Sequence, residues 1–302
     1  VLKSRVDECA PFENVYTLAL RGLHDRAMNA SNNMSDRKEM LQEALMAQRQ
    51  MLVDAIGKRA EDIPQAFTPY KEVLDVYDQG LELPDDVTII WPDDNYGYMK
   101  RLSSPKEQKR SGRSGVYYHS SYLGKPHDHL WMNTTSPTLM YEELRKAYDM
   151  TADRIWLLNA GDIKSCEFAV DYFLTMAFDI DSFSFERAAN YRTEWLCGML
   201  GNDYRNEYQD VINSFYKLAF ARKPEFMGWG YQWATDKHGR ERNTDTDFSL
   251  ANYREVDTRL AEYQRIGNMV EKILKALPED KKACYYLSLI HISEPTRHAQ
   301  IS

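Results

Sequence analysis

The chain has 302 residues, a length that allows one large domain or two smaller ones. Hydrophobic residues make up 43% and charged residues 28% of the sequence, which is typical of a soluble globular protein. The net charge of −8 argues against nucleic acid or an anionic membrane surface as the main partner. No apolar run approaches the ~20 residues of a membrane-spanning helix. The 4 cysteines are widely spaced without a CxxC pair, so we expect free or buried thiols.

Strands and helices alternate from residue 14 to about residue 178. The strand candidates are short apolar runs at residues 15–20, 65–68, 87–91, 115–120 and 154–159. The helix candidates lie at residues 35–57, 72–79, 136–150 and from shortly after 159 to about 176. Repeated β-then-α units predict parallel strands with right-handed crossovers. We therefore expect an α/β fold, with residues 1–181 forming about the last five βα units of a partial (β/α)8 TIM-type barrel.

The pattern changes after residue 181. Aromatic and charged residues recur there at helical spacing, and no strand is convincing. We expect helices at residues 185–200, 202–221 and 249–277, with a turn-rich interval at 228–246. Residues 182–286 are thus predicted to form an α-helical bundle domain. Residues 287–302 resemble the translation of a sequencing-library adapter, and we expect them not to be native.

Polar residues follow the end of the first two predicted strands, where a β/α barrel places its active site. After the first strand come Arg21, His24 and Asp25. Asp25 could protonate a leaving oxygen, and Arg21 could bind a carboxylate through two parallel hydrogen bonds. Alternatively, Asp25 caps a helix and His24 is a satisfied buried histidine. After the second strand, Glu72 could face the barrel centre or simply lie in the first turn of a helix.

The loop Trp91–Tyr98 follows the third strand and is the most informative stretch of the chain. Its carboxylates and Asn95 suit the hydroxyl groups of a sugar, and the rings of Trp91, Tyr96 and Tyr98 suit its C–H face. The alternative is a surface loop with a chance cluster of such residues.

The fourth and fifth predicted strands carry weaker signals. Tyr117 and His119 share one face of the fourth strand because strand side chains alternate. The nearby pair His127 and His129 could suggest a metal site, but it lacks a third ligand at motif spacing. After the fifth strand, Asp162 could bind a hydroxyl group or an anion.

Taken together, these residues resemble glycoside hydrolase family 115, the xylan α-1,2-glucuronidases. The motifs that carry the resemblance are YTLALRGLHD at 16–25, PYKEVLD at 69–75, WPDDNYGY at 91–98, VYYH at 116–119 and NAGDIK at 159–164. The resemblance covers nearly all of residues 13–286. Leu20 and Ala160 depart from the family pattern, which has Met and often Val at those positions, and both changes exchange one apolar residue for another.

The resemblance implies an inverting hydrolase that removes glucuronic acid, or its 4-O-methyl form, from the O-2 of xylose in glucuronoxylan. We expect no cofactor and no metal ion. Inversion needs two carboxyl groups ~6.5–9.5 Å apart, and Asp25 and Glu72 match the family's catalytic positions. We expect Asp25 to be the acid and Glu72 the base, although the sequence does not decide between the two roles. The expected substrate-binding residues are Arg21, His24, Trp91, Asn95, Tyr96, Tyr117, His119 and Asp162.

The same resemblance implies further barrel strands before Val1 and further domains after residue 286, so we expect the 302-residue chain alone to be inactive and prone to aggregate. Because xylan is extracellular, we expect a secreted or periplasmic protein, and the full-length protein could form a homodimer. Two alternatives stay open. One is a carbohydrate-binding protein without catalysis, and the other is a metal-dependent barrel hydrolase using His24, His119, His127 and Asp162.

Overall fold

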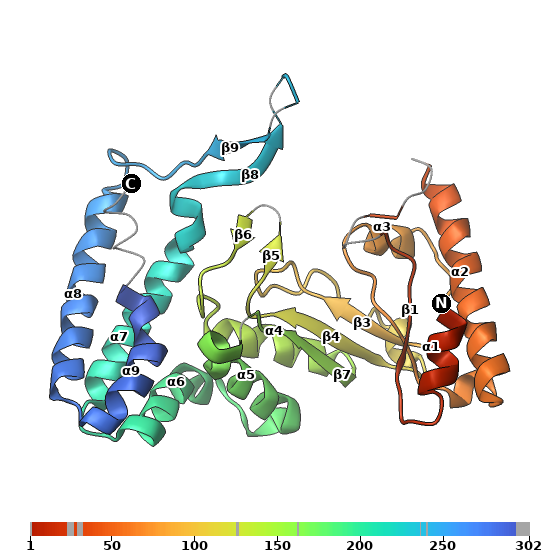
Figure 1. Ribbon diagram of the computed structural model, residues 1–302, viewed down its shortest axis with the longest axis horizontal. Coiled ribbons are helices and arrows are strands. Elements are labelled where there is room, and N and C mark those ends of the chain that lie inside the picture. The colour runs from red at the N-terminus through yellow and green to blue at the C-terminus, as the bar shows by residue number, and fades with distance from the viewer. Residues whose placement is uncertain are drawn as a thin grey trace. The chain divides into compact units, whose positions relative to one another are not determined.

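The computed structural model describes residues 2–22, 27–28, 33–124, 127–161, 163–235, 237–239 and 241–293. The chain has a mixed α/β fold and divides into two compact units (Figure 1). The first contains Val1–Asp94, Tyr98–Tyr118 and Leu144–Leu157, and the second contains Asn95–Gly97, His119–Glu143 and Leu158–Ser302. The division falls within the sheet, whereas the sequence predicts a domain boundary after residue 181.

A five-stranded sheet follows the order β1-β2-β3-β4-β7. The strands are β1 (Tyr16–Leu18), β2 (Gln65–Phe67), β3 (Thr88–Pro92), β4 (Ser114–His119) and β7 (Ala152–Asn159). The registers of the first four strands are parallel, with Leu18 opposite Phe67 and Phe67 opposite Ile89. All five predicted strands are confirmed, with ends that differ by at most two residues. Residues of β2 and β3 are buried throughout, as expected for inner parallel strands covered on both faces.

The first unit also contains α1 (Leu2–Cys9), α2 (Met34–Ile56) and α3 (Glu72–Asp78), and α1 and α2 lie side by side (Figure 1). The side chain of Asn33 accepts a hydrogen bond from the Ser35 amide and caps α2, which ends at the left-handed Gly57. One face of α2 packs on the sheet. The shared hydrophobic cluster includes Leu41, Leu45, Leu52, Phe67, Val76, Ile89 and Trp91.

The second unit is largely helical. Its helices are α5 (Ile163–Phe178), α6 (Phe185–Leu200), α7 (Arg205–Ala221), α8 (Glu255–Ala276) and α9 (Glu279–Ser293), while α4 (Pro137–Asp149) is shared between the units. Neighbouring helices from α6 to α9 pack against one another (Figure 1). Their hydrophobic cluster includes Leu196, Tyr208, Val211, Phe215, Ile266, Val270 and Tyr285. The helices predicted at 185–200, 202–221 and 249–277 are therefore present, the last beginning six residues later.

The expectation of no strand after residue 181 is wrong. An antiparallel hairpin, β8 (Trp229–Thr235) and β9 (Glu241–Asp245), occupies the interval predicted to be rich in turns (Figure 1). Aromatic residues stand at every second position from Trp229, which is the period of a strand. The glycines and charged residues of the same interval favour turns, which is why the sequence predicts turns there and not strands. A second small hairpin joins β5 (Leu123–Gly124) and β6 (His127–His129).

Helix α9 continues past residue 286 into the segment predicted not to be native, and Leu289 is buried. The origin of residues 287–302 stays a prediction, and residues 294–302 lie outside the described part. No described helix is both long and apolar enough to cross a membrane.

Candidate active site

Arg21 and Glu72 form an ion pair in the first unit, just beyond the C-terminal ends of β1 and β2. The Arg21 guanidinium donates from Nε to Glu72 Oε1 at 3.3 Å and from Nη2 to Glu72 Oε2 at 3.2 Å. The backbone N–H of Met28 also donates to Oε1, at 3.3 Å. Three donors thus fix the orientation of the Glu72 carboxylate. Both side chains remain 19% exposed, so solvent can reach the pair.

Aromatic rings lie beside this pair. The guanidinium carbon of Arg21 lies 5.4 Å from the centroid of the Tyr70 ring, and the Lys71 ammonium lies 4.9 Å from it. The ring of Tyr117, on β4, meets Tyr70 edge-on at 5.9 Å. Two cations therefore lie near one ring; Arg21 is paired with Glu72, and the Lys71 ammonium adds positive charge beside that pair.

A sharp bend in the chain places these groups. Lys71 has a φ of 53° and a ψ of −122°, a conformation that L-residues rarely adopt, and Glu72 is the first residue of α3. Such strain is often found where a functional side chain must be held in one place. Glu72 is therefore both a first-turn residue of a helix and the partner of Arg21. A place in the first turn of a helix is thus compatible with a role in the site. Tyr70 was not predicted, although its place two residues before Glu72 could have indicated it.

The partner of Arg21 differs from the one expected. The sequence predicts that Arg21 binds a substrate carboxylate through two parallel hydrogen bonds. In the structure, Nε and Nη2 are both directed at Glu72. Arg21 therefore orients a carboxyl group of the protein itself.

Trp91 is not a sugar-stacking residue in this structure, which corrects the prediction. Its side chain is 0% exposed. The indole Nε1 donates to Ser103 Oγ at 2.9 Å, the Arg101 guanidinium lies 4.4 Å from the ring centroid, and the Tyr77 ring meets it edge-on at 5.8 Å. Both the ring and its N–H are covered by protein groups, so Trp91 is a buried support at the start of the loop after β3.

Arg101 is itself held by carboxylates. It pairs with Asp78 at 2.9 Å and with Glu107, of the short 3-10 helix η3 (Glu107–Lys109), at 2.9 Å. Burial acts to raise the pKa of Glu107, but hydrogen bonds from Arg101, Ser104 and Tyr77 outweigh it and lower the pKa to about 2. The loop after β3 thus lies on a charged and aromatic network.

The loop after β3 forms a tight turn. The Asp94 N–H donates to the Tyr98 carbonyl at 2.8 Å, and the Tyr98 N–H donates to Asp94 Oδ1 at 3.1 Å. Asn95 and Gly97 have φ values of 72° and 94°. Tyr98 is 43% exposed, whereas the ring of Tyr96 lies 6.0 Å from that of Phe226 within the second unit.

The remaining predicted residues are distributed as follows. His119 ends β4, is 1% exposed and meets the Tyr122 ring edge-on at 5.5 Å in the second unit. His24, Asp25 and Asp162 lie outside the described residues. Their roles, including that of Asp25 as the second catalytic carboxyl group, stay predictions.

Within the described residues, no group of three or more His, Cys, Asp or Glu side chains is arranged to hold a metal ion. Of the residues in the alternative metal site, His24, Asp162 and the side chain of His127 fall outside that search. The alternative is therefore not tested.

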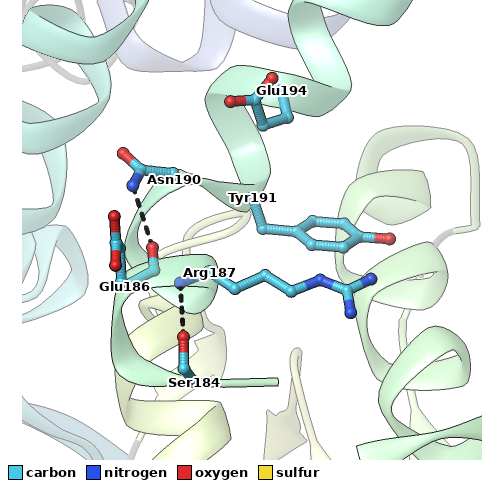
Figure 2. A pocket seen from close by; sticks show the side chains of 6 residues that line it. All are labelled: Ser184, Glu186, Arg187, Asn190, Tyr191 and Glu194. Atoms are coloured by element: carbon cyan, nitrogen blue, oxygen red, sulfur yellow. Dashed lines mark hydrogen bonds between the residues drawn. The ribbon is translucent and has the colours of Figure 1, made fainter. Parts of the chain in front are cut away.

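A separate hollow of about 440 Å³ lies on α6 (Figure 2). Its polar groups are engaged within the protein. Ser184 Oγ accepts from the Arg187 N–H at 3.1 Å, Asn190 donates to the Glu186 carbonyl at 3.0 Å, and Glu194 pairs with Arg205. Because these groups bind α6 and the neighbouring α7, the Arg21–Glu72 region is the better candidate for catalysis.

Comparisons with known proteins identify a family and a similar structure. The sequence model of glycosyl hydrolase family 115 matches residues 1–226. A solved structure described as a novel family 115 4-O-methyl-α-glucuronidase with specificity for decorated arabinogalactans is 36% identical, with a TM-score of 0.88. The match covers 98% of this chain and 38% of that chain, so the present chain spans well under half of its length. No curated protein matches.

Proposed function

The chain belongs to glycosyl hydrolase family 115, and from this premise we propose that it forms part of an inverting α-glucuronidase. The proposed reaction releases glucuronic acid or its 4-O-methyl form from the O-2 of xylose in glucuronoxylan. The observation that carries the proposal is the partly exposed Glu72 carboxylate, held by Arg21 and Met28 beside Tyr70. A decorated arabinogalactan is the second candidate substrate, because a similar structure is described as specific for such polymers.

In the proposed mechanism, Glu72 is the general base. Its carboxylate takes a proton from a water molecule that attacks the anomeric carbon, while Asp25 protonates the leaving oxygen on the opposite face. The hydrogen bonds from Arg21 and Met28 keep the carboxylate in one orientation, which lowers the entropic cost of reaching the transition state. The Lys71 ammonium beside the Tyr70 ring suits the uronate carboxylate, and Tyr98, which is 43% exposed, offers a surface for the sugar.

We further propose that the sheet is part of a TIM-type (β/α)8 barrel and that this chain belongs to a longer polypeptide. The order of the strands across the sheet follows the order of the chain, as in a barrel wall. The chain spans 38% of the similar structure. In this proposal the helices of the second unit form a bundle domain, and the 302-residue chain alone is inactive. The whole protein is secreted or periplasmic and could form a homodimer.

The test uses the full-length protein that carries this chain, incubated separately with glucuronoxylan and with a decorated arabinogalactan. Proton NMR of the early products identifies the free uronic acid and its anomer. Initial release of the β-anomer is the expected result, because an inverting enzyme acts on an α-linkage. Initial release of the α-anomer would contradict inversion. Binding of both polymers without release would favour a carbohydrate-binding protein, and loss of release on adding a chelator would favour the metal-dependent alternative.

A further inference from the structure

The short 3-10 helix η5 (Pro224–Met227) follows α7 and is held firmly within the second unit. The Phe226 carbonyl accepts a hydrogen bond from Thr246 Oγ1 at 2.9 Å. Just before η5, Arg222 donates to Asp247 at 2.8 Å and to Glu255, on α8, at 3.1 Å. The backbone of η5 is thus fixed to α8 and to the segment after β9.

The opposite side of η5 is tied to the segment that follows β6. Glu225 Oε2 accepts from the Trp131 N–H at 3.2 Å, and Lys223 donates to Thr134 Oγ1 at 3.1 Å. Burial raises the pKa of Glu225, in keeping with its position inside the unit. Hydrogen bonds thus join η5 and the two residues before it to α8, to the segment after β9 and to the segment after β6.

Phe226 projects from this fixed helix to the tip of the loop after β3. Its ring lies 6.0 Å from the Tyr96 ring, with 44° between the ring planes. The tip, Asn95–Gly97, belongs by its contacts to the second unit, whereas the base of the same loop, Asp94 and Tyr98, belongs to the first. Asn95 has a φ of 72°, in the left-handed region that costs a non-glycine residue some energy, whereas Gly97 adopts its φ of 94° without steric cost.

We propose that Phe226 is a positioning residue, which holds Tyr96 and thereby fixes the Asn95 amide in the orientation that meets the sugar. The inference rests on the proposed function, because it requires Asn95 to bind substrate. Phe226 does not touch the substrate and acts through the ring of Tyr96. A residue 130 positions later in the chain thus determines the shape of the substrate-binding loop.

The experiment compares the full-length protein with its Phe226→Ala, Phe226→Tyr and Phe220→Ala variants. Phe226→Ala removes the ring and Phe226→Tyr keeps it. Phe220 is the matched control, since it is a phenylalanine of the same unit that is 83% exposed. Two quantities are measured: KM and kcat for uronic acid release, and hydrogen exchange of peptides covering residues 93–99.

For Phe226→Ala we expect KM to rise about fivefold, the effect of losing one aromatic pair, with kcat within about twofold because ground-state and transition-state binding weaken together. Hydrogen exchange should increase in residues 93–99 and not in α7 or α8. The Phe226→Tyr and Phe220→Ala variants should match the parent protein. A lower kcat with unchanged KM, or unchanged exchange in the loop, would overturn the proposal. If the parent protein releases no uronic acid, the proposed function fails, while the exchange data still decide whether Phe226 positions the loop.

Discussion

At the residue scale, the candidate site depends on how Arg21 holds Glu72. The two residues are 51 positions apart, and the parallel pairing of β1 with β2 brings their strand ends together. A planar guanidinium meets a carboxylate with two parallel hydrogen bonds, whereas a lysine ammonium is a point charge without that geometry. Both side chains are mostly buried, so loss of one partner leaves the other charge poorly compensated.

Replacing Arg21 by lysine tests this geometry. In the full-length protein that carries this chain, we expect Arg21→Lys to reduce kcat/KM about 10- to 100-fold, because the Glu72 carboxylate loses its fixed orientation. Stability should fall by about 1–2 kcal/mol. Arg113 makes a similar two-bond contact with Asp153 away from the site, so Arg113→Lys is the matched control and should leave kcat/KM unchanged. Equal losses in both variants would show that the effect is not specific to the site.

Replacing Glu72 by glutamine tests its role as a base. In the full-length protein, we expect Glu72→Gln to lower kcat about 10²- to 10⁴-fold, because an amide cannot take a proton from water. Polymer binding, measured by calorimetry, should persist because the side chain keeps its size. Glu39, an exposed residue of α2, provides the control Glu39→Gln. Retained turnover in Glu72→Gln would assign catalysis to other groups.

At the scale of elements, the loop after β3 is supported by a network from neighbouring segments. The Trp91 ring on β3 lies against the Arg101 guanidinium, and Glu107 of η3 binds both Arg101 and the Tyr77 hydroxyl of α3. The network therefore joins a strand, a helix and a loop. The pKa of Glu107, lowered to about 2, means that the folded protein favours its ionised form.

The pH dependence of stability should report on this network. A carboxyl group with a depressed pKa stabilises the fold above its ordinary pKa of 4.5, and that contribution is lost as the pH falls toward 2. We expect Glu107→Gln to lower the unfolding free energy by about 1–2 kcal/mol at pH 7. Between pH 4.5 and pH 2, the unfolding free energy of this variant should fall less steeply than that of the parent protein. Urea unfolding at several pH values measures both effects. Glu61→Gln, at an exposed site, is the control. If the unfolding free energy of Glu107→Gln fell with acid as steeply as that of the parent protein, the prediction would be contradicted.

At the scale of the whole molecule, each unit has its own hydrophobic cluster. The cluster of the first unit joins α2 to the sheet, and that of the second joins α6, α7, α8 and α9. The two clusters have no member in common. Residues that share no packing partner contribute to stability almost independently.

Core substitutions should therefore have local effects. Leu45 of the first cluster and Ile266 of the second are both fully buried, and we expect each to lose about 2–5 kcal/mol on replacement by alanine. Native-state hydrogen exchange should show the loss from Leu45→Ala in α2 and that from Ile266→Ala in α7 and α8. In the double variant the two losses should add within about 0.5 kcal/mol. A large deviation would show that the clusters are coupled.

The sequence by itself determined the α/β class, the five strands and the places where polar residues follow them, because strand and helix periods and strand-end chemistry are local properties. Only the tertiary structure decided which of these side chains meet and which are covered. Arg21 is paired with Glu72, and Trp91 lies beneath Arg101. The β8–β9 hairpin also became visible only in the structure. Burial and pairing depend on segments far apart in the chain, and no local pattern carries that information.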